Sequence, residues 1–500
     1  MNTGRKDGMS YNFVTFIDFV FCLLYDESEC NAIKFRRRAA RGLPFIGGAF
    51  LESLKKFLRS APFAVLQLLL ACVFVFTGQE VAGTMIFSGV IAATLAVTGD
   101  VMTGLPGLML TVCFAIRCKH AFGKFLHHWY LAVPTFVFFA IYLIAHRHPL
   151  SKGRYFLGLL PVSVAVTLGG LGIITPSEYF SATPIFYTIL LGFGMLFLYL
   201  FLHGALTARP KEDHEALLTR AMLCTIFFLC ICLVQEYCYR RNELQGGFEI
   251  LPFQWRNNAS TLLMLAMPFP FYLACRRYGW FYVGLLVYLA ILFTGSRGGM
   301  IFGAGELLLC IVVSAVIDRR HRLPTLITLV VILLLVFLIR RYLLETFRYT
   351  LERLLDPHEN AARLQLLPRG LADFKANPLF GRGLGYLGNR DVHRNAKYTL
   401  CWYHCSPVQV LGSFGLVGAA AYGWMLLVRL RVLAKHLTLF NLTLFLSYLG
   451  LELMSFVNPG IFAPFPYLFL VTLYFALMEA RTTDADRAGF LAVLKKEETA

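Results

Sequence analysis

Charged residues are scarce in this sequence: they account for 15% of its 500 residues, whereas hydrophobic residues account for 58%. A soluble protein carries about 25% charged residues, so the composition excludes an ordinary soluble enzyme. The apolar residues fall in runs of about 16–24 residues, long enough to cross a hydrocarbon core of about 30 Å as helices. Long polar stretches are few, so no separate soluble domain is predicted.

Metal-binding patterns are also lacking. The 13 cysteines show no metal-ligand spacing, and most lie inside apolar runs, where a cysteine behaves as a small hydrophobic residue. Cys401 and Cys405 are exceptions at the end of a long polar stretch, and a disulfide or a metal pair between them stays open. No cofactor and no metal are expected.

No internal repeat is visible, and Asp18 interrupts the first apolar stretch, which is atypical of a cleavable signal.

Basic residues outnumber acidic ones, and the net charge is +17. In a soluble protein this would indicate nucleic acid, but here the basic residues lie in short segments between apolar runs. Because cytoplasmic loops are rich in Lys and Arg, this pattern orients a membrane protein. No nucleic-acid partner is expected, and both chain ends are predicted to be cytoplasmic. Two short outer loops break the rule, one at Arg117–Lys124 and one at Arg240–Arg241.

The predicted fold class is all-α, a polytopic transmembrane helix bundle of about 12–14 spans with one large extracytoplasmic loop. Candidate spans lie near 61–77, 81–98, 104–117, 125–145, 155–175, 184–205, 217–238, 258–275, 279–294, 299–317, 324–343, 406–428, 438–457 and 460–478. The count near 61–125 stays open, because two early spans are short enough to form one re-entrant pair. The predicted parts are a cytoplasmic or interfacial region at 1–60, a membrane domain at 61–480 that includes the outer loop 344–403, and a cytoplasmic tail at 481–500.

The turn Gly295-Ser296-Arg297-Gly298-Gly299 joins two apolar runs with almost no loop, on the predicted outer face. An arginine so close to hydrocarbon needs a partner. A lipid phosphate or pyrophosphate fits, since guanidinium binds phosphate oxygens in a bidentate fork. Arg297 snorkelling to lipid head groups is the alternative.

The outer loop 344–403 carries nine Lys and Arg against six Asp and Glu. Within it, Leu364, Leu367, Leu371 and Phe374 recur at helical spacing, although Pro368 is expected to bend or break that helix. The pattern predicts an amphipathic element over the membrane that carries Arg363 and Arg369 towards a polar cavity. A solvated loop helix without a ligand is the alternative.

Three further residues complete the candidate site. Arg382 lies in the glycine-rich turn 377–385, His404 ends the loop, and Arg256 precedes the eighth span. Imidazole titrates near neutrality and accepts a proton from an attacking hydroxyl. A structural histidine at the membrane interface is the alternative for His404, and Arg256 is a candidate phosphate or sugar contact.

Taken in order, these features of residues 255–425 resemble the O-antigen ligase and O-antigen polymerase superfamily of bacterial membrane glycosyltransferases. They are the Ser-Arg-Gly-Gly turn, two spans, the loop helix, the Asn-Pro-Leu-x-Gly-x-Gly-like turn, and a histidine leading into the span at 408–418. One departure is Cys405, where the family commonly has asparagine.

The resemblance implies an enzyme of the GT-C type in the bacterial cytoplasmic membrane. It implies a polyprenyl-pyrophosphate-linked glycan as donor, transferred without a metal to a glycan, lipid or cell-wall acceptor at the outer face. Arg297 and Arg363 would hold the pyrophosphate, and His404 would act as general base or position the acceptor. Arg382, Arg256 and Arg369 would be further substrate contacts.

Several alternatives stay open on sequence alone. A polysaccharide flippase or another multi-span transporter is the main rival, although the central spans are nearly free of charge, with Glu306 and Glu452 as the main acidic exceptions. A membrane scaffold or sensor without chemistry is the second. The sequence does not distinguish a polymerase from a ligase, because both use the same donor. It does not identify the sugar, the acceptor or the oligomeric state.

Overall fold

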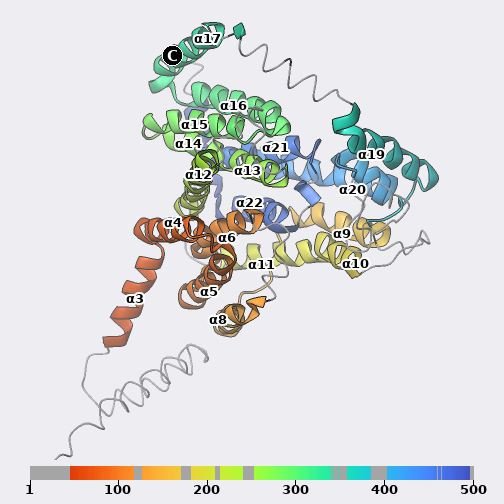
Figure 1. Ribbon diagram of the computed structural model, residues 1–500. Helices are drawn as coiled ribbons and strands as arrows, with labels where there is room; N and C mark the ends of the chain where they lie inside the picture. The colour runs from red at the N-terminus through yellow and green to blue at the C-terminus, as the bar shows by residue number, and fades with distance from the viewer. Residues whose placement is uncertain are drawn as a thin grey trace, which may run out of the picture. The chain divides into compact units, whose positions relative to one another are not determined.

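The structure is a computed structural model that describes residues 46–117, 127–170, 182–208, 214–239, 253–338, 340–341, 348, 357–384, 403–458, 460–462 and 464–495. Throughout these ranges the chain forms helices and connecting turns, with no strand (Figure 1). The all-helical prediction is confirmed for this part of the chain. The chain divides into two compact units, residues Met1–His148 with Ala216–Cys224, and Pro149–Glu215 with Thr225–Ala500.

The first unit contains short apolar helices and two 3-10 turns. These are α3 (Ile46–Leu58), α4 (Ala61–Phe76), α5 (Glu80–Thr98), η1 (Val101–Gly104), α6 (Leu105–Arg117), η2 (Trp129–Ala132) and α8 (Val133–Ala145). Phe74, Phe87 and Phe114 meet edge to face in its core, with ring centroids 5.5–6.2 Å apart. Gly99 ends α5 in the left-handed conformation, and the Asp100 side chain then accepts from the N–H of Met102 to begin η1.

The second unit carries every candidate site residue. Its helices are α9 (Phe156–Gly170), α10 (Ala182–Ile189), α11 (Met195–Thr207), most of α12 (His214–Tyr239), α13 (Phe253–Ala266), α14 (Pro268–Ala274), α15 (Gly279–Phe293), α16 (Arg297–Ile317), α17 (Arg322–Leu338), α19 (Pro357–Ala376), α20 (Ser406–Lys435), α21 (Leu439–Met454), α22 (Phe469–Arg481) and α23 (Asp484–Lys495). Short turns η3 (Leu190–Gly194), η5 (Arg319–His321), η7 (Gly460–Phe462) and η8 (Pro464–Leu468) connect some of them.

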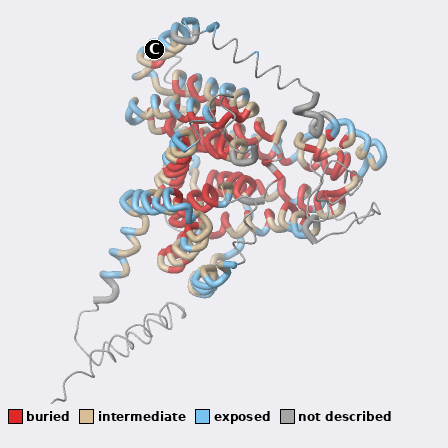
Figure 2. The backbone as a smooth tube through the Cα atoms, in the orientation of Figure 1, coloured by how far each residue is buried: buried red, intermediate tan, exposed pale blue. Residues whose placement is uncertain are grey.

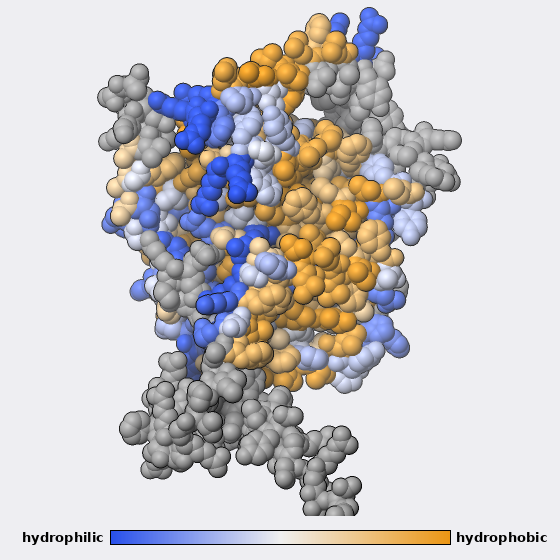
Figure 3. All heavy atoms as spheres, turned by 90° about the vertical axis from the view of Figure 1, so that its left-hand side faces the viewer, coloured by the Kyte–Doolittle hydropathy of each residue, from blue (hydrophilic) through white to orange (hydrophobic). Residues whose placement is uncertain are grey.

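Most helices coincide with predicted spans, because long apolar runs favour both helix and membrane. Five described helices are long and apolar enough to cross a membrane, or six if the bent pair Phe50–Leu58 and Ala61–Phe76 is one span. The count of 12–14 therefore stays a prediction. Helix α17 exposes leucine, valine and phenylalanine along its length, whereas α22 is buried from Leu470 to Met478 (Figure 2). Hydrophobic residues form a broad patch over part of the face shown in Figure 3, beside hydrophilic ones, and lipid contact requires such a surface.

Helix α20 is broken, and the break shapes the candidate site. Gly415 has φ 65° and ψ −158°, which interrupts the helix. In a straight helix Ser406 and Arg429 would lie about 34 Å apart, at about 1.5 Å per residue. Yet Ser406 hydrogen bonds to Ser455 and Arg429 to Glu452, two residues within one turn of α21. Helix α20 therefore bends sharply at Gly415, where the sequence predicts one uninterrupted span at 406–428.

Candidate functional site

The Ser-Arg-Gly-Gly turn is a capped helix start. Gly295 has φ 71°, and the Oγ of Ser296 accepts from the N–H of Gly299 at 3.3 Å, which caps α16. The same Oγ donates to Oδ1 of Asn257 at 2.8 Å. Arg297 is the first residue of α16, and Arg256 precedes Asn257 near the start of α13. The structure thus brings together the two helix starts that carry these arginines.

The glycines after Arg297 allow close packing against two other helices. A Cβ on Gly298 would lie 2.6 Å from Val457 and 3.1 Å from the sulfur of Met454, at the end of α21. A Cβ on Gly299 would lie 1.7 Å from Oγ of Ser260 in α13. Any side chain at these positions would push the turn away from α13 and α21.

The segment with His404 reaches the same end of α21. The N–H and the Oγ of Ser406 both donate to the carbonyl of Ser455, at 3.0 and 2.9 Å. His404 lies two residues before Ser406 and has φ 55°, which makes it the non-glycine residue with positive φ in the described chain. Since Gly298 also packs there, Arg297 and His404 both lie near the C-terminal end of α21.

Helix α19 docks beside His404 through the preceding residue, Tyr403. The hydroxyl of Tyr403 donates to Oδ2 of Asp373 at 2.7 Å, and a Cβ on Gly370 would lie 2.9 Å from the Tyr403 ring. Arg369, half-buried, directly precedes Gly370. Figure 1 shows α19 alongside α20.

Two residues of the apolar stripe predicted for α19 are exposed. Leu367 and Leu371 are 36% and 43% exposed, whereas Leu366 is buried. The helix continues through Pro368 instead of ending there. Arg363 lies in the same helix, but its side chain is outside the described residues, as is Cys401.

The glycine-rich turn with Arg382 pairs with the broken part of α20. The N–H of Arg382 donates to the carbonyl of Gly412 at 2.8 Å, and the N–H of Gly383 donates to that of Ser413 at 3.0 Å. On the other side of the break, the N–H of Leu416 donates to the carbonyl of Pro378 at 2.8 Å. The turn therefore takes up backbone hydrogen bonds that the interruption at Gly415 would otherwise leave unmade.

These contacts gather the candidate residues around a few helix ends. The starts of α13, α16 and α20 and the end of α21 meet through Asn257, Ser296, Ser406 and Ser455. Three of these four are helix N-termini, which carry partial positive charge. The arrangement can attract an anionic group to a face that also carries arginine and histidine.

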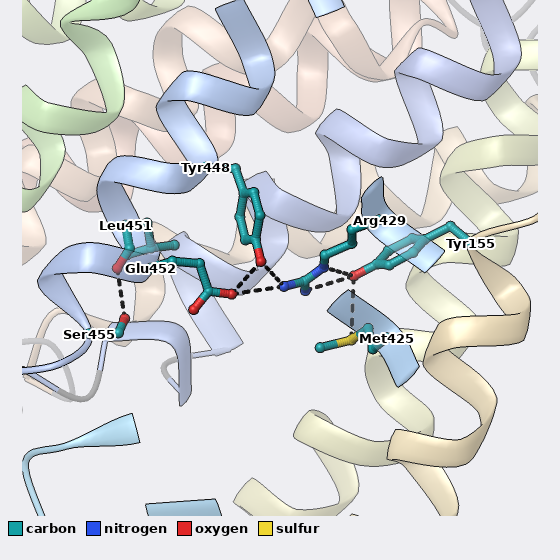
Figure 4. Close-up of polar contacts among 7 residues, drawn as sticks. All are labelled: Tyr155, Met425, Arg429, Tyr448, Leu451, Glu452 and Ser455. Atoms are coloured by element: carbon teal, nitrogen blue, oxygen red, sulfur yellow. Dashed lines mark hydrogen bonds and ion pairs between the residues drawn. The ribbon is translucent and has the colours of Figure 1, made fainter. Parts of the chain in front are cut away.

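A buried arginine contacts the last turn of the same helix, α21, through Glu452. Arg429 is 1% exposed and donates to the hydroxyl of Tyr155 at 3.1 and 2.8 Å, to that of Tyr448 at 2.7 Å, and to Glu452 at 3.0 Å (Figure 4). Its guanidinium also lies 4.6 Å from the ring centroid of Tyr448 and 5.5 Å from that of Phe475. The cluster joins α9, α20, α21 and α22. The predicted span at 406–428 ends just before Arg429, whereas the structure places Arg429 inside α20. There Glu452 balances its charge, and Tyr155, Tyr448 and Glu452 accept its hydrogen bonds.

Sequence reasoning missed the polar residues that hold the turns together, among them Asn257, Gln409, Asp373 and Ser455. An amide or carboxylate next to a candidate residue is too common to single out. Glu452 had a signal, because it is a charged residue within an apolar run. Among the described residues, no group of three His, Cys, Asp or Glu side chains could hold a metal ion.

Comparison with known proteins agrees with the predicted resemblance. Residues 281–423 match the family model described as O-antigen ligase. No curated protein and no solved structure matches the chain. The matched segment runs from α15 to the broken part of α20 and includes Arg297, Arg363, Arg369, Arg382 and His404. The predicted resemblance to the O-antigen ligase and O-antigen polymerase superfamily is therefore confirmed for this segment of the chain.

Proposed function

We propose that this protein transfers a glycan from polyprenyl pyrophosphate to an acceptor at the outer face of the bacterial cytoplasmic membrane. One observation carries the proposal: the family match covers the turns that bear Arg297, Arg382 and His404, and contacts of their neighbours converge on α20 and the end of α21. The donor would place its diphosphate between these turns and its polyprenyl chain in lipid.

Electrostatics favours an anionic ligand at this face. Arg297 begins α16, so its guanidinium adds to the partial positive charge of the helix N-terminus. The nearby N-termini of α13 and α20 add further partial positive charge. We assign Arg297 and Arg363 to the pyrophosphate, and Arg382, Arg256 and Arg369 to further contacts with phosphate or sugar.

The proposed reaction is a substitution at the anomeric carbon of the donor. The acceptor oxygen forms the new bond to that carbon, and the bond from the carbon to the pyrophosphate oxygen breaks. The acceptor proton passes to His404, and the electron pair leaves on the polyprenyl pyrophosphate. Arginines that stabilise the growing negative charge act more strongly in the transition state than before it, and each such contact contributes roughly 10² to 10³ in rate.

Arginines would here supply the positive charge that a divalent cation supplies in many soluble glycosyltransferases. Transfer is therefore expected to proceed in excess EDTA. A requirement for added magnesium or manganese would contradict this assignment while leaving the reaction class intact.

The test is transfer by the purified protein in lipid vesicles, supplied with polyprenyl-pyrophosphate oligosaccharide. New glycosidic product and free polyprenyl pyrophosphate should appear together. Arg297→Ala and Arg363→Ala should abolish both, and His404→Ala should reduce both at least 10²-fold. Arg277→Ala is a matched control, because Arg277 lies at the opposite end of α15 from Arg297. Movement of the donor between leaflets without new product would support a flippase instead.

The choice between polymerase and ligase rests on the acceptor. A deletion strain whose surface glycan is resolved by length separates the two. Loss of long chains with single repeats retained indicates a polymerase, whereas long chains that remain on their carrier indicate a ligase.

A further inference from the structure

The backbone at His404 adopts a conformation that neighbouring residues must hold in place. Its φ of 55° is left-handed and costs about 1–2 kcal/mol for a residue with a side chain. Such conformations persist where the surroundings determine them, and they concentrate at functional sites. The contacts on both sides of His404 therefore determine where its imidazole lies.

The side chain of Gln409 provides one of these contacts. It is fully buried, and its Oε1 accepts from the N–H of Tyr403 at 2.9 Å. The N–H of Gln409 donates to the carbonyl of Cys405 at 2.8 Å. One residue thus binds the backbone directly before and directly after His404.

The other end of the same amide binds the part of α20 that holds the glycine-rich turn. Nε2 of Gln409 donates to Oγ of Ser413 at 2.8 Å, and Ser413 is also fully buried. The carbonyl of Ser413 accepts from Gly383, the residue after Arg382. A single amide therefore bridges the segment with His404 and the segment that anchors Arg382.

We propose that Gln409 is a positioning residue that holds His404 in its left-handed conformation and in register with the Arg382 turn. This inference rests on the proposed function. An amide suits the role because it offers an acceptor and a donor in one group. Gln409 does not act on the substrate itself. Loss of the Gln409 side chain would let the imidazole of His404 move. This movement slows the chemical step more than it weakens donor binding.

The test compares kcat and KM for the donor in the vesicle assay. Gln409→Leu removes both side-chain hydrogen bonds of Gln409. In this variant kcat should fall about 10²-fold, as expected when a catalytic group moves by about 1 Å, and KM should change less than about threefold. Gln409→Glu should restore most of kcat, because its oxygen still accepts from Tyr403 and the hydroxyl of Ser413 can donate to it. Thr472→Val is the control: Thr472 is fully buried and bonds within its own helix, so kcat should stay within about twofold.

Two outcomes would overturn the inference, and they separate it from the proposed function. A wild-type kcat in Gln409→Leu, with His404→Ala inactive, refutes the positioning role alone. A wild-type kcat in His404→Ala refutes both. If Gln409→Leu does not fold, Ser413→Ala decides. This variant removes only the hydrogen bond from Nε2 of Gln409 to Ser413 and should reduce kcat about tenfold. An unchanged kcat would count against the inference.

Discussion

The buried pair of Arg429 and Glu452 should be strongly coupled in stability. Arg429 is 1% exposed and Glu452 20% exposed, with 3.0 Å between their nitrogen and oxygen atoms. Removal of one partner of a buried pair leaves an uncompensated charge and typically costs about 3–5 kcal/mol. Replacement of both by apolar residues often costs little, because the desolvation of two charges is avoided as well.

We therefore expect Glu452→Leu to lower the free energy of unfolding by about 3–5 kcal/mol. The double variant Arg429→Met with Glu452→Leu should lose clearly less than the sum of the two single variants. Arg431→Met is the matched control, since Arg431 lies two residues away, is exposed, and stacks on Trp424 with 5.2 Å to the ring centroid. It should lose no more than about 1 kcal/mol.

Equilibrium unfolding in mixed detergent micelles with increasing SDS, followed by tryptophan fluorescence, gives these free energies. The double-mutant cycle then gives the coupling energy, which should be at least about 2 kcal/mol. Additive losses would show that the guanidinium is stabilised by Tyr155 and Tyr448 alone, and would refute the reasoning.

Three further substitutions test contacts within the second unit, two of them at the site. Gly415→Ala should displace the Arg382 turn and abolish transfer. Gly415 has φ 65°, and its Cβ would lie 2.4 Å from a backbone carbonyl. Gly423→Ala in the same helix, with open space around it, should keep activity. Gly299→Ala should reduce transfer at least tenfold, because its Cβ would meet a serine Oγ of α13 at 1.7 Å, whereas Gly305→Ala, also in open space, should not. Glu479→Ala should cost about 1–2 kcal/mol in the SDS assay, since Glu479 accepts from two backbone N–H groups before α9.

The helices could be predicted from the sequence because apolar runs and helix-capping residues are local signals. The start of α16 is an example: Ser296 follows one apolar run and precedes another, and the structure shows it as the cap. The prediction of a helix at α19 also rested on local spacing, and a helix forms there; its amphipathic role over the membrane stays a prediction.

The broken α20 could not be predicted in this way. Gly412, Gly415 and Gly418 recur every three residues, and nothing local distinguishes the one that breaks the helix. The break forms at Gly415 because the turn from Pro378 supplies hydrogen bonds to the residues beside it. Those partners lie 30 or more residues away along the chain.

The burial of Arg429 could not be predicted for the same reason, and the predicted span ends at residue 428. Its basic side chain lies near Arg431 and Lys435, which is typical of a cytoplasmic loop. Only its partners show that it is buried, and one of them, Tyr155, lies 274 residues away in sequence. Pairing between distant helices decides whether such a charged side chain is buried or exposed.

The most direct test of the account is an experimental structure of the protein in lipid with polyprenyl pyrophosphate bound. We predict that the diphosphate contacts the guanidinium groups of Arg297 and Arg363 on the extracytoplasmic side, with the imidazole of His404 facing the same space. A diphosphate bound elsewhere, or Arg297 and Arg363 on opposite sides of the membrane, would contradict the proposed enzyme.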